Sequence, residues 1–345
     1  MSNITIERSG LLSTVQDEGR FNLRHLGIPW SGCMTPVWQK LSNALVGNEL
    51  TQSVIECWEG GLQFNTGDKS LRLAVAADLA AVVSIEADTY TTQLNPFQSY
   101  TAPPNSIIKV KSTGNFRHAI IAISGLDVAH QLGSSATYAK AGLGGINGAA
   151  LKAGDTLAVG IAPGGAEHVC SNPLTDAYKS CELRVVLGPQ EDHFSDEGIN
   201  NLLNSDYMLG TDADRMGVRL SGPSVMHKNA ASKDIVSDAI VPGSIQVPGT
   251  GQPIVLLRDA HTAGGYPKVA TVVSIDLPLL GLQRAGNVFR FRTISIDEAI
   301  DSVRQQKMDV DFALNNLNRV VQTSLTTATL LSNNLIDGVT DGKIF

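Results

Sequence analysis

Residues 241–267 read VPGSIQVPGTGQPIVLLRDAHTAGGYP, and this stretch decides how the rest of the chain is interpreted. Glycines and prolines at both ends bracket one short apolar run, Pro253 to Leu257, which has the length of a single buried strand. The pattern therefore predicts a loop, a strand and a second loop. Short strands between frequent turns are typical of a β-rich fold.

Polar groups crowd both sides of this strand. Arg258 and Asp259 end it, and only one of the two can face a given cavity, because neighbouring side chains of a strand point to opposite faces. The following turn contains Thr262, Gly264, Gly265 and Tyr266. Two adjacent glycines allow positive φ and leave backbone N–H groups uncovered, so the turn can hold an anion. Gln246 adds an amide that both donates and accepts. The alternative is a hairpin whose glycines serve only geometry.

The composition bounds the class of protein. The 345 residues suffice for two domains, and 33 glycines with only 5% aromatic residues suit a β-rich chain with many turns. The formal net charge of −7, without a cluster of Lys and Arg, argues against binding to nucleic acid or to an anionic membrane.

Several site types and targeting signals are absent from the sequence. The N-terminus has no signal-peptide pattern and no apolar run approaches a membrane span, which predicts a cytoplasmic protein. The four cysteines never form a CxxC and are expected to be reduced thiols, and the seven histidines are scattered, so no metal site is expected. Nucleotide and hydrolase signatures such as GxxxxGK[ST] and GxSxG do not occur.

The first half, residues 1–175, is expected to be a β domain with one helix. Thr35 and Pro36 have the form of an N-cap and first helical residue, and the helix should stop at Gly47. Before it, Gln16 and Arg20 flank a glycine in QDEGR, which is ordinary turn chemistry with a possible ligand role. Residues 125–155 form a long glycine-rich loop.

The second half, residues 181–325, follows a polar linker and carries the GGYP turn. Short strands are expected around YMLGTDADRMGVRLSG, KVATVVSID and NVFRFRTISI. A helix should begin at Asp297 and extend toward Val321, with an apolar stripe that suits the core or an interface with another protein chain. Residues 326–345 form a tail without a clear pattern.

Eight phrases in the same order resemble the biotin-dependent carboxyltransferase family, also described as the allophanate hydrolase subunit 2 family. They are STVQDEGR, GIPWSGCMT, LSNALVGN, SGLDV…LGSSATYAKAGLGG, LGPQEDHF, ADRMGVRL, PGSIQVPGTGQPIVLLRDAHTAGGYP and DLPLLGLQRAGNVFRF. The family includes the C-type subunit of ATP-dependent 5-oxoprolinase, the carboxyltransferase domain of urea carboxylase and a bacterial kinase-inhibitor-associated protein.

The resemblance implies two tandem cyclophilin-like β-barrels with a few helices. It also implies a component of an ATP-dependent 5-oxoprolinase, a lactam-opening hydrolase complex. The partners would be a related-fold subunit like allophanate hydrolase subunit 1, of the 5-oxoprolinase B type, and a lactam-opening A-type subunit. The substrate would be a small amide or lactam, and ATP would be used by the complex, since this chain has no ATP motif. Biotin enters only if the chain is a carboxyltransferase acting on urea or a similar amide.

The chain departs from the family pattern at several positions. Thr35 stands where the family usually has an acidic residue, and Ala149 stands where an arginine is common. His261 replaces an amide of the usual QTTGGYP or QTGGYP with a titratable imidazole. These losses favour a further alternative, a non-catalytic regulatory subunit of the kinase-inhibitor type.

The mechanistic hypothesis assigns a role to each polar group of the turn. Asp259 would be the general base or orienting carboxylate, while Gln246 and Tyr266 would orient an amide or lactam. Arg215 would hold a carboxylate through its planar fork; the alternative is a structural pair with Asp212 or Asp214. The anion pocket and the remaining substrate contacts would be formed by Gly264, Gly265, Thr262, His261, Gln16 and Arg20.

Overall fold

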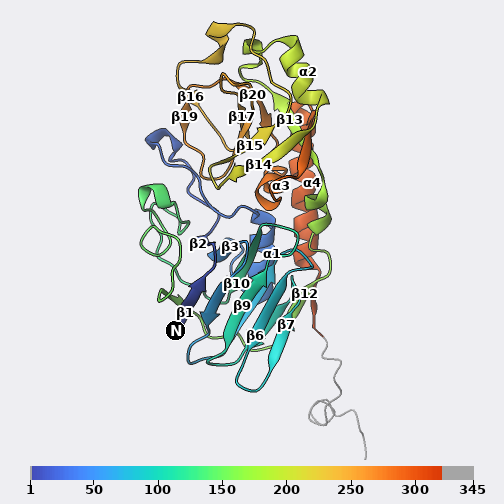
Figure 1. Cartoon of the computed structure of the whole chain (residues 1–345). Coiled ribbons are helices and arrows are strands. Elements are labelled where there is room, and N and C mark those ends of the chain that lie inside the picture. Colours follow the sequence, from blue (N-terminus) through green and yellow to red (C-terminus); the bar gives the residue numbers. More distant parts are fainter. Residues whose placement is uncertain (1, 321–345) are drawn as a thin grey trace, which may run out of the picture.

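The computed structural model describes residues 2–320, which form two β-rich halves connected by helices (Figure 1). The expected mainly β class is confirmed, because strands far outnumber the four α-helices found in the described part of the chain. The predicted tail at 326–345 and Val321, the far end of the predicted last helix, lie outside the described residues. No helix within residues 2–320 is long and apolar enough to cross a membrane.

The first half consists of two antiparallel sheets that enclose an apolar core. The six-stranded sheet has the order β11-β1-β4-β9-β6-β7, with bounds β1 (Ser2–Ser9), β4 (Leu62–Asn65), β6 (Val82–Glu86), β7 (Thr91–Leu94), β9 (Ile107–Ser112) and β11 (Thr156–Val159). The five-stranded sheet has the order β2-β3-β10-β5-β8, with bounds β2 (Leu12–Gln16), β3 (Val54–Trp58), β5 (Leu71–Ala76), β8 (Ser99–Ala102) and β10 (His118–Ile123). In β1, Ile4 and Ile6 are buried between exposed neighbours, the period-two pattern of a strand with one face on a core.

Helix α1 (Pro36–Val46) packs on β5 and β10 of the five-stranded sheet. It begins at Pro36 and stops at Gly47, whose φ of 77° lies in the left-handed region, so the predicted bounds are confirmed. Thr35 is the N-cap residue, but its hydroxyl lies 3.3 Å from Nε2 of the buried His118 and makes no side-chain cap. Because α1 covers this part of the sheet, β5 and β10 are buried on both faces.

The second half is a closed barrel. Its seven strands have the order β13-β20-β17-β18-β15-β14-β21, with bounds β13 (Glu182–Leu187), β14 (Tyr207–Ala213), β15 (Gly217–Ser221), β17 (Ser244–Gln246), β18 (Ile254–Leu256), β20 (Lys268–Val272) and β21 (Val288–Thr293). The predicted strands in this half are all found. Strands β13 and β21 pair in parallel and close the barrel. Helix α2 (Asp196–Asn204) packs against β21, and α3 (Leu277–Leu282) follows β20.

The last helix joins the two halves. Helix α4 (Ile296–Asn315) starts beside the barrel strand β13, and it also packs against α1 of the first half. Strand β22 (Leu317–Arg319) then pairs with β12 (His168–Cys170). One apolar cluster runs through α1, the barrel interior, α3 and α4, so the halves share a continuous core. We propose that the boundary between the halves lies at residues 175–181, as predicted.

The remaining elements are short. Strands β16 (Asp238–Ala239) and β19 (Ala263–Gly264) form a two-stranded sheet outside the barrel. The 3-10 turns are η1 (Arg24–Leu26), η2 (Ala139–Ala141), η3 (Thr175–Lys179), η4 (Glu191–His193) and η5 (Ala230–Lys233). Residues 125–155 contain η2 and isolated bridges without a regular strand, which agrees with the predicted long loop.

Candidate functional site

The outer face of the barrel carries the candidate site. Val218 of β15, Ile245 of β17 and Val255 of β18 point into the barrel core. Side chains alternate between the two faces of a strand, so their neighbours Arg219, Gln246 and the residues beside Val255 face outward. The segment after β18 crosses this outer face as a strap, defined here as residues 258–267. Ile240, Leu256 and Ala260 form a small apolar cluster of their own.

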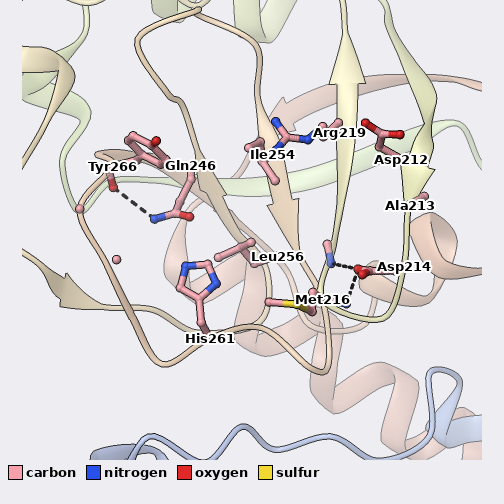
Figure 2. Close-up of a pocket in the computed structure, with 13 residues that line it drawn as sticks. Asp212, Ala213, Asp214, Met216, Arg219, Gln246, Ile254, Leu256, His261 and Tyr266 are labelled. Carbon is pink, nitrogen blue, oxygen red and sulfur yellow. Dashed lines mark hydrogen bonds between the residues drawn. The ribbon is translucent and has the colours of Figure 1, made fainter. Parts of the chain in front are cut away.

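A cavity of about 490 Å³ lies between the strap and these strands (Figure 2). It is lined by Asp212, Ala213, Asp214, Met216, Gly217, Arg219, Gln246, Ile254, Leu256, His261, Gly264, Gly265 and Tyr266. The apolar lining comes from β18 and from Ala213 and Met216 of the β14–β15 hairpin. The polar lining comes from the same hairpin, β17 and the strap. This volume suits a small organic substrate.

The Gln246 amide and Tyr266 meet at the cavity, as the sequence predicts. Gln246 is only 3% exposed, and its Nε2 lies 3.4 Å from the backbone oxygen of Tyr266 (Figure 2). Such a long hydrogen bond is weak, so the amide can exchange it for a ligand. The Tyr266 side chain is 42% exposed.

Gly264 is required for close approach and not for a positive φ. Neither Gly264 nor Gly265 has a positive φ, so the expected tight turn with positive φ at these glycines is wrong. Gly264 instead belongs to strand β19. A Cβ on Gly264 would lie 2.8 Å from Gln246 Nε2, 3.1 Å from His261 Nε2 and 2.6 Å from Ile240 Cδ1. Any side chain here would therefore press on the amide and the imidazole.

His261 reaches the cavity from the start of the strap, and its ring points toward Gln246 in Figure 2. Burial lowers the pKa of this imidazole, and the nearby cations Arg24 and Lys140 lower it further. Both cations come from the first half. Arg24 donates from Nη2 to the backbone oxygens of Ile240 at 2.5 Å and His261 at 2.9 Å, so the first half holds the strap in place.

Arg215 and Asp259 lie outside the cavity, in a buried ion network. Arg215 Nε and Nη2 bind the two Asp259 oxygens at 3.0 and 3.2 Å, and Nη1 binds Glu56 of β3. Nη2 also donates to Gly32 O at 2.6 Å. The alternative partners considered for Arg215, Asp212 and Asp214, line the cavity instead.

The network connects both halves through buried side chains. Exposure is 0% for Glu56, 7% for Arg215 and 8% for Asp259. Burial acts to raise the pKa of Glu56, but Arg215 and hydrogen bonds from Met34 N and Trp58 outweigh it and the pKa is lowered. Since the fork of Arg215 is fully used by protein groups, a substrate carboxylate would have to displace one of them.

Gln16 and Arg20 are buried in the first half and do not line the cavity. Gln16 Nε2 donates to Thr137 O at 3.2 Å, while Arg20 donates to Gln131 O at 3.0 Å and Ser134 O at 3.2 Å. Both therefore anchor the long loop. Thr262 is also absent from the lining, and its backbone oxygen accepts from Ile240 N.

The cavity also contains polar residues that the sequence analysis did not select. Arg219 is exposed, and among residues 2–320 it forms no ion pair. Asp214 accepts hydrogen bonds from Met216 N at 2.7 Å and Gly217 N at 3.2 Å, so it shapes the β14–β15 turn. Alternation with the buried Val218 and Leu220 indicated that Arg219 points away from the barrel. It did not indicate that a strap would cover that face.

No cluster of three or more His, Cys, Asp or Glu side chains that could hold a metal ion occurs in the described part of the chain.

Comparisons with known proteins agree with this architecture. A family profile described as carboxyltransferase domain, subdomain A and B, matches residues 26–293. The chain is 29% identical over 304 residues to the C-type subunit of 5-oxoprolinase from Escherichia coli K12, covering 88% of this chain and 95% of that protein. It is 30% identical over 312 residues to the C-type subunit of 5-oxoprolinase from Haemophilus influenzae, covering 87% and 94%.

A solved structure gives the same fold. The crystal structure of Kluyveromyces lactis urea carboxylase aligns with a TM-score of 0.78 at 23% identity, over 90% of this chain. The alignment covers 29% of that protein, so the chain spans less than a third of its length.

Proposed function

This chain belongs to the carboxyltransferase domain family of subdomains A and B, and we propose that it is the C-type subunit of an ATP-dependent 5-oxoprolinase. One observation carries the proposal: the similarity to two 5-oxoprolinase C-type subunits extends over 95% and 94% of their lengths. The match thus extends over nearly the whole length of that subunit. In this reaction the complex opens the lactam ring of 5-oxoproline to glutamate.

The cavity suits a small cyclic amide. The carbonyl oxygen of a lactam needs a donor that strengthens its bond as negative charge develops. Gln246 Nε2 is such a donor, because its present contact with Tyr266 O is long at 3.4 Å. The apolar side chains Ile254 and Leu256 on the same wall would cover the ring methylenes. We assign Gln246 to the amide oxygen.

Arg219 is the better candidate for the substrate carboxylate. Arg215, proposed from the sequence for this role, is already paired with Asp259 and Glu56. Arg219 lines the cavity and has no ion-pair partner among residues 2–320. An arginine fork binds a carboxylate through two parallel hydrogen bonds. We therefore move the carboxylate role from Arg215 to Arg219. We assign Asp259 the role of holding Arg215 in the buried ion network.

The cavity does not fit the triphosphate of ATP. Its lining includes the carboxylates of Asp212 and Asp214 and a single arginine, a set that would repel a polyanion. We therefore propose that a partner subunit binds ATP and that this chain contributes to the lactam end of the site. The expected B-type and A-type partner subunits remain part of this proposal.

The second candidate is carboxyl transfer to urea or a similar amide. The matching family is described as a carboxyltransferase domain, and the fold is shared with a urea carboxylase. When bound, biotin already carboxylated by another enzyme component would supply the carboxyl group, and its ureido ring presents an amide oxygen that Gln246 would bind. This reading needs a biotinylated partner.

The test is ATP hydrolysis by this chain mixed with the subunits encoded beside it. We expect ADP release that depends on 5-oxoproline. Arg219→Met should raise the KM for 5-oxoproline about 10- to 100-fold, the size expected for a lost charged hydrogen bond. The matched control is Arg290→Met, which removes an exposed arginine of β21 that pairs with Asp206. This change should leave KM unchanged. A wild-type mixture without 5-oxoproline-dependent ADP release would refute the proposal. Carboxyl transfer to urea would then favour the second candidate.

A further inference from the structure

The imidazole of His261 is a titratable ring on the cavity wall that protein groups leave free. Neither ring nitrogen makes a hydrogen bond within residues 2–320, whereas the backbone oxygen of His261 is held by Arg24. The backbone is thus fixed while the ring faces the cavity (Figure 2). A side chain held in this way is available to a ligand.

His261 and Gln246 converge on one point. The position of a Cβ on Gly264 lies 3.1 Å from His261 Nε2 and 2.8 Å from Gln246 Nε2. The two nitrogens therefore lie on the same side of Gly264 and close to each other. A small planar group placed beside Gly264 would therefore reach the donor of the amide and the nitrogen of the imidazole together. An amide has the matching pair of atoms, a carbonyl oxygen and an adjacent N–H.

Asp259 is not positioned for proton transfer from a ligand in this cavity. Both of its carboxylate oxygens accept from Arg215, and the residue does not line the cavity. A general base must come within hydrogen-bond reach of the proton that it removes. His261 lines the cavity and can come into contact with a ligand there, which Asp259 cannot.

The surroundings favour the neutral, accepting form of His261. Burial lowers its pKa, and Arg24 and Lys140 act in the same direction. The other charged or titratable side chains on the cavity wall are Asp212, Asp214, Arg219 and Tyr266. An imidazole with a pKa below its ordinary value of about 6.5 is mostly unprotonated at pH 7 and can accept a proton.

We propose that His261 is a catalytic residue that accepts the N–H proton of the bound amide while Gln246 donates to the amide oxygen. The N–H bond breaks, and its electron pair stays on the amide nitrogen and is delocalised onto the oxygen. The proton forms a new bond to His261 Nε2, which becomes an imidazolium. The proposal rests on the proposed function only in requiring an amide substrate, and it applies equally to a lactam and to urea. General-base catalysis of this kind typically contributes about 10²- to 10⁴-fold.

The first test is an NMR titration of the His261 ring in the purified chain, alone and with 5-oxoproline, 2-pyrrolidone or urea. A ligand N–H that donates to Nε2 stabilises the neutral ring, so at least one amide should lower the pKa of His261. A ligand carboxylate that pairs with the imidazolium would raise it. The proposal is overturned if no amide lowers the pKa. A decrease with 2-pyrrolidone or urea but not with 5-oxoproline would support the base and refute the 5-oxoprolinase assignment, so the two failures are distinguishable.

The second test uses turnover by the assembled complex. The kcat/KM of the wild type should fall at low pH as His261 becomes protonated. His261→Ala should lower kcat/KM about 10²- to 10⁴-fold and remove this acid limb. His261→Ala should regain activity when imidazole is added, which a purely structural role would not allow. His168→Gln, on strand β12 away from the cavity, is the control and should keep the wild-type pH profile. A His261→Ala enzyme with the wild-type rate and acid limb would refute the proposal.

Discussion

Replacing Arg215 by methionine should destabilise the protein in a way that depends on pH. The change leaves Glu56, which is fully buried, without its cation, and it also leaves Asp259 unpaired. Removing one partner of a buried ion pair commonly costs about 3–5 kcal/mol. The buried carboxyl can avoid remaining ionised by taking up a proton, which sets an upper limit on the cost at Glu56.

The size of this limit follows from the ordinary pKa of glutamate. Holding a carboxyl of pKa near ~4.3 in its protonated form costs about 3.7 kcal/mol at pH 7 and about 1 kcal/mol at pH 5. In the wild type the pKa of Glu56 is lowered, so the network stabilises the fold above the unfolded pKa and this contribution is lost as the pH falls. In the variant the pKa of Glu56 should be raised. The stability difference between the two proteins should therefore shrink by about 2–3 kcal/mol from pH 7 to pH 5.

Urea denaturation of both proteins at the two pH values measures this difference. Arg219→Met is the matched control, because Arg219 is an exposed arginine on the same hairpin and its loss should change stability by no more than about 0.5 kcal/mol. A cost below about 1 kcal/mol for Arg215→Met at pH 7, or the same cost at both pH values, would show that Glu56 is not a buried carboxylate dependent on Arg215.

Two further predictions concern the strap. Gly264→Ala should weaken binding of small amides at least tenfold, because the added Cβ displaces the Gln246 amide. The free energy of unfolding should change by no more than about 1–3 kcal/mol. Ligand titration measures the affinity and urea denaturation measures the stability; an unchanged affinity would show that Gly264 does not position Gln246 for binding. Arg24→Met should speed exchange of the backbone amide hydrogens in the strap, because the backbone oxygens of Ile240 and His261 lose their donor. Hydrogen exchange measured by mass spectrometry tests this, and an unchanged rate would show that Arg24 does not hold the strap.

Local signals were read correctly from the sequence. Helix α1 has Pro36 at its first turn and Gly47 after its last residue, and these positions depend only on nearby residues. Gln246 and Tyr266 were also expected together. Gln246 ends β17 and Tyr266 lies just before β20, and the pairing of these two strands, with Gln246 opposite Lys268, brings them to one cavity.

Contacts between residues far apart in the sequence limited the prediction of the other site residues. Arg215 was expected to meet a substrate or a neighbouring aspartate, but one of its partners, Glu56, lies 159 residues away on a strand of the other half. No pattern within the turn around Arg215 indicates that contact. Arg219 was missed for a related reason: period two separates inner from outer residues, but only the tertiary path of the strap decides which outer face becomes a cavity wall.

The pairing of β22 with β12 has a consequence for exchanging parts between relatives. Strand β22 follows the barrel and α4 in the chain, yet it forms a ladder with residues that precede the barrel. A chimera joined near residue 180 would combine a β12 from one parent with a β22 from the other, and it would set a foreign α4 against α1. Swaps confined to 182–293 keep both contacts from one parent and are the ones that should assemble.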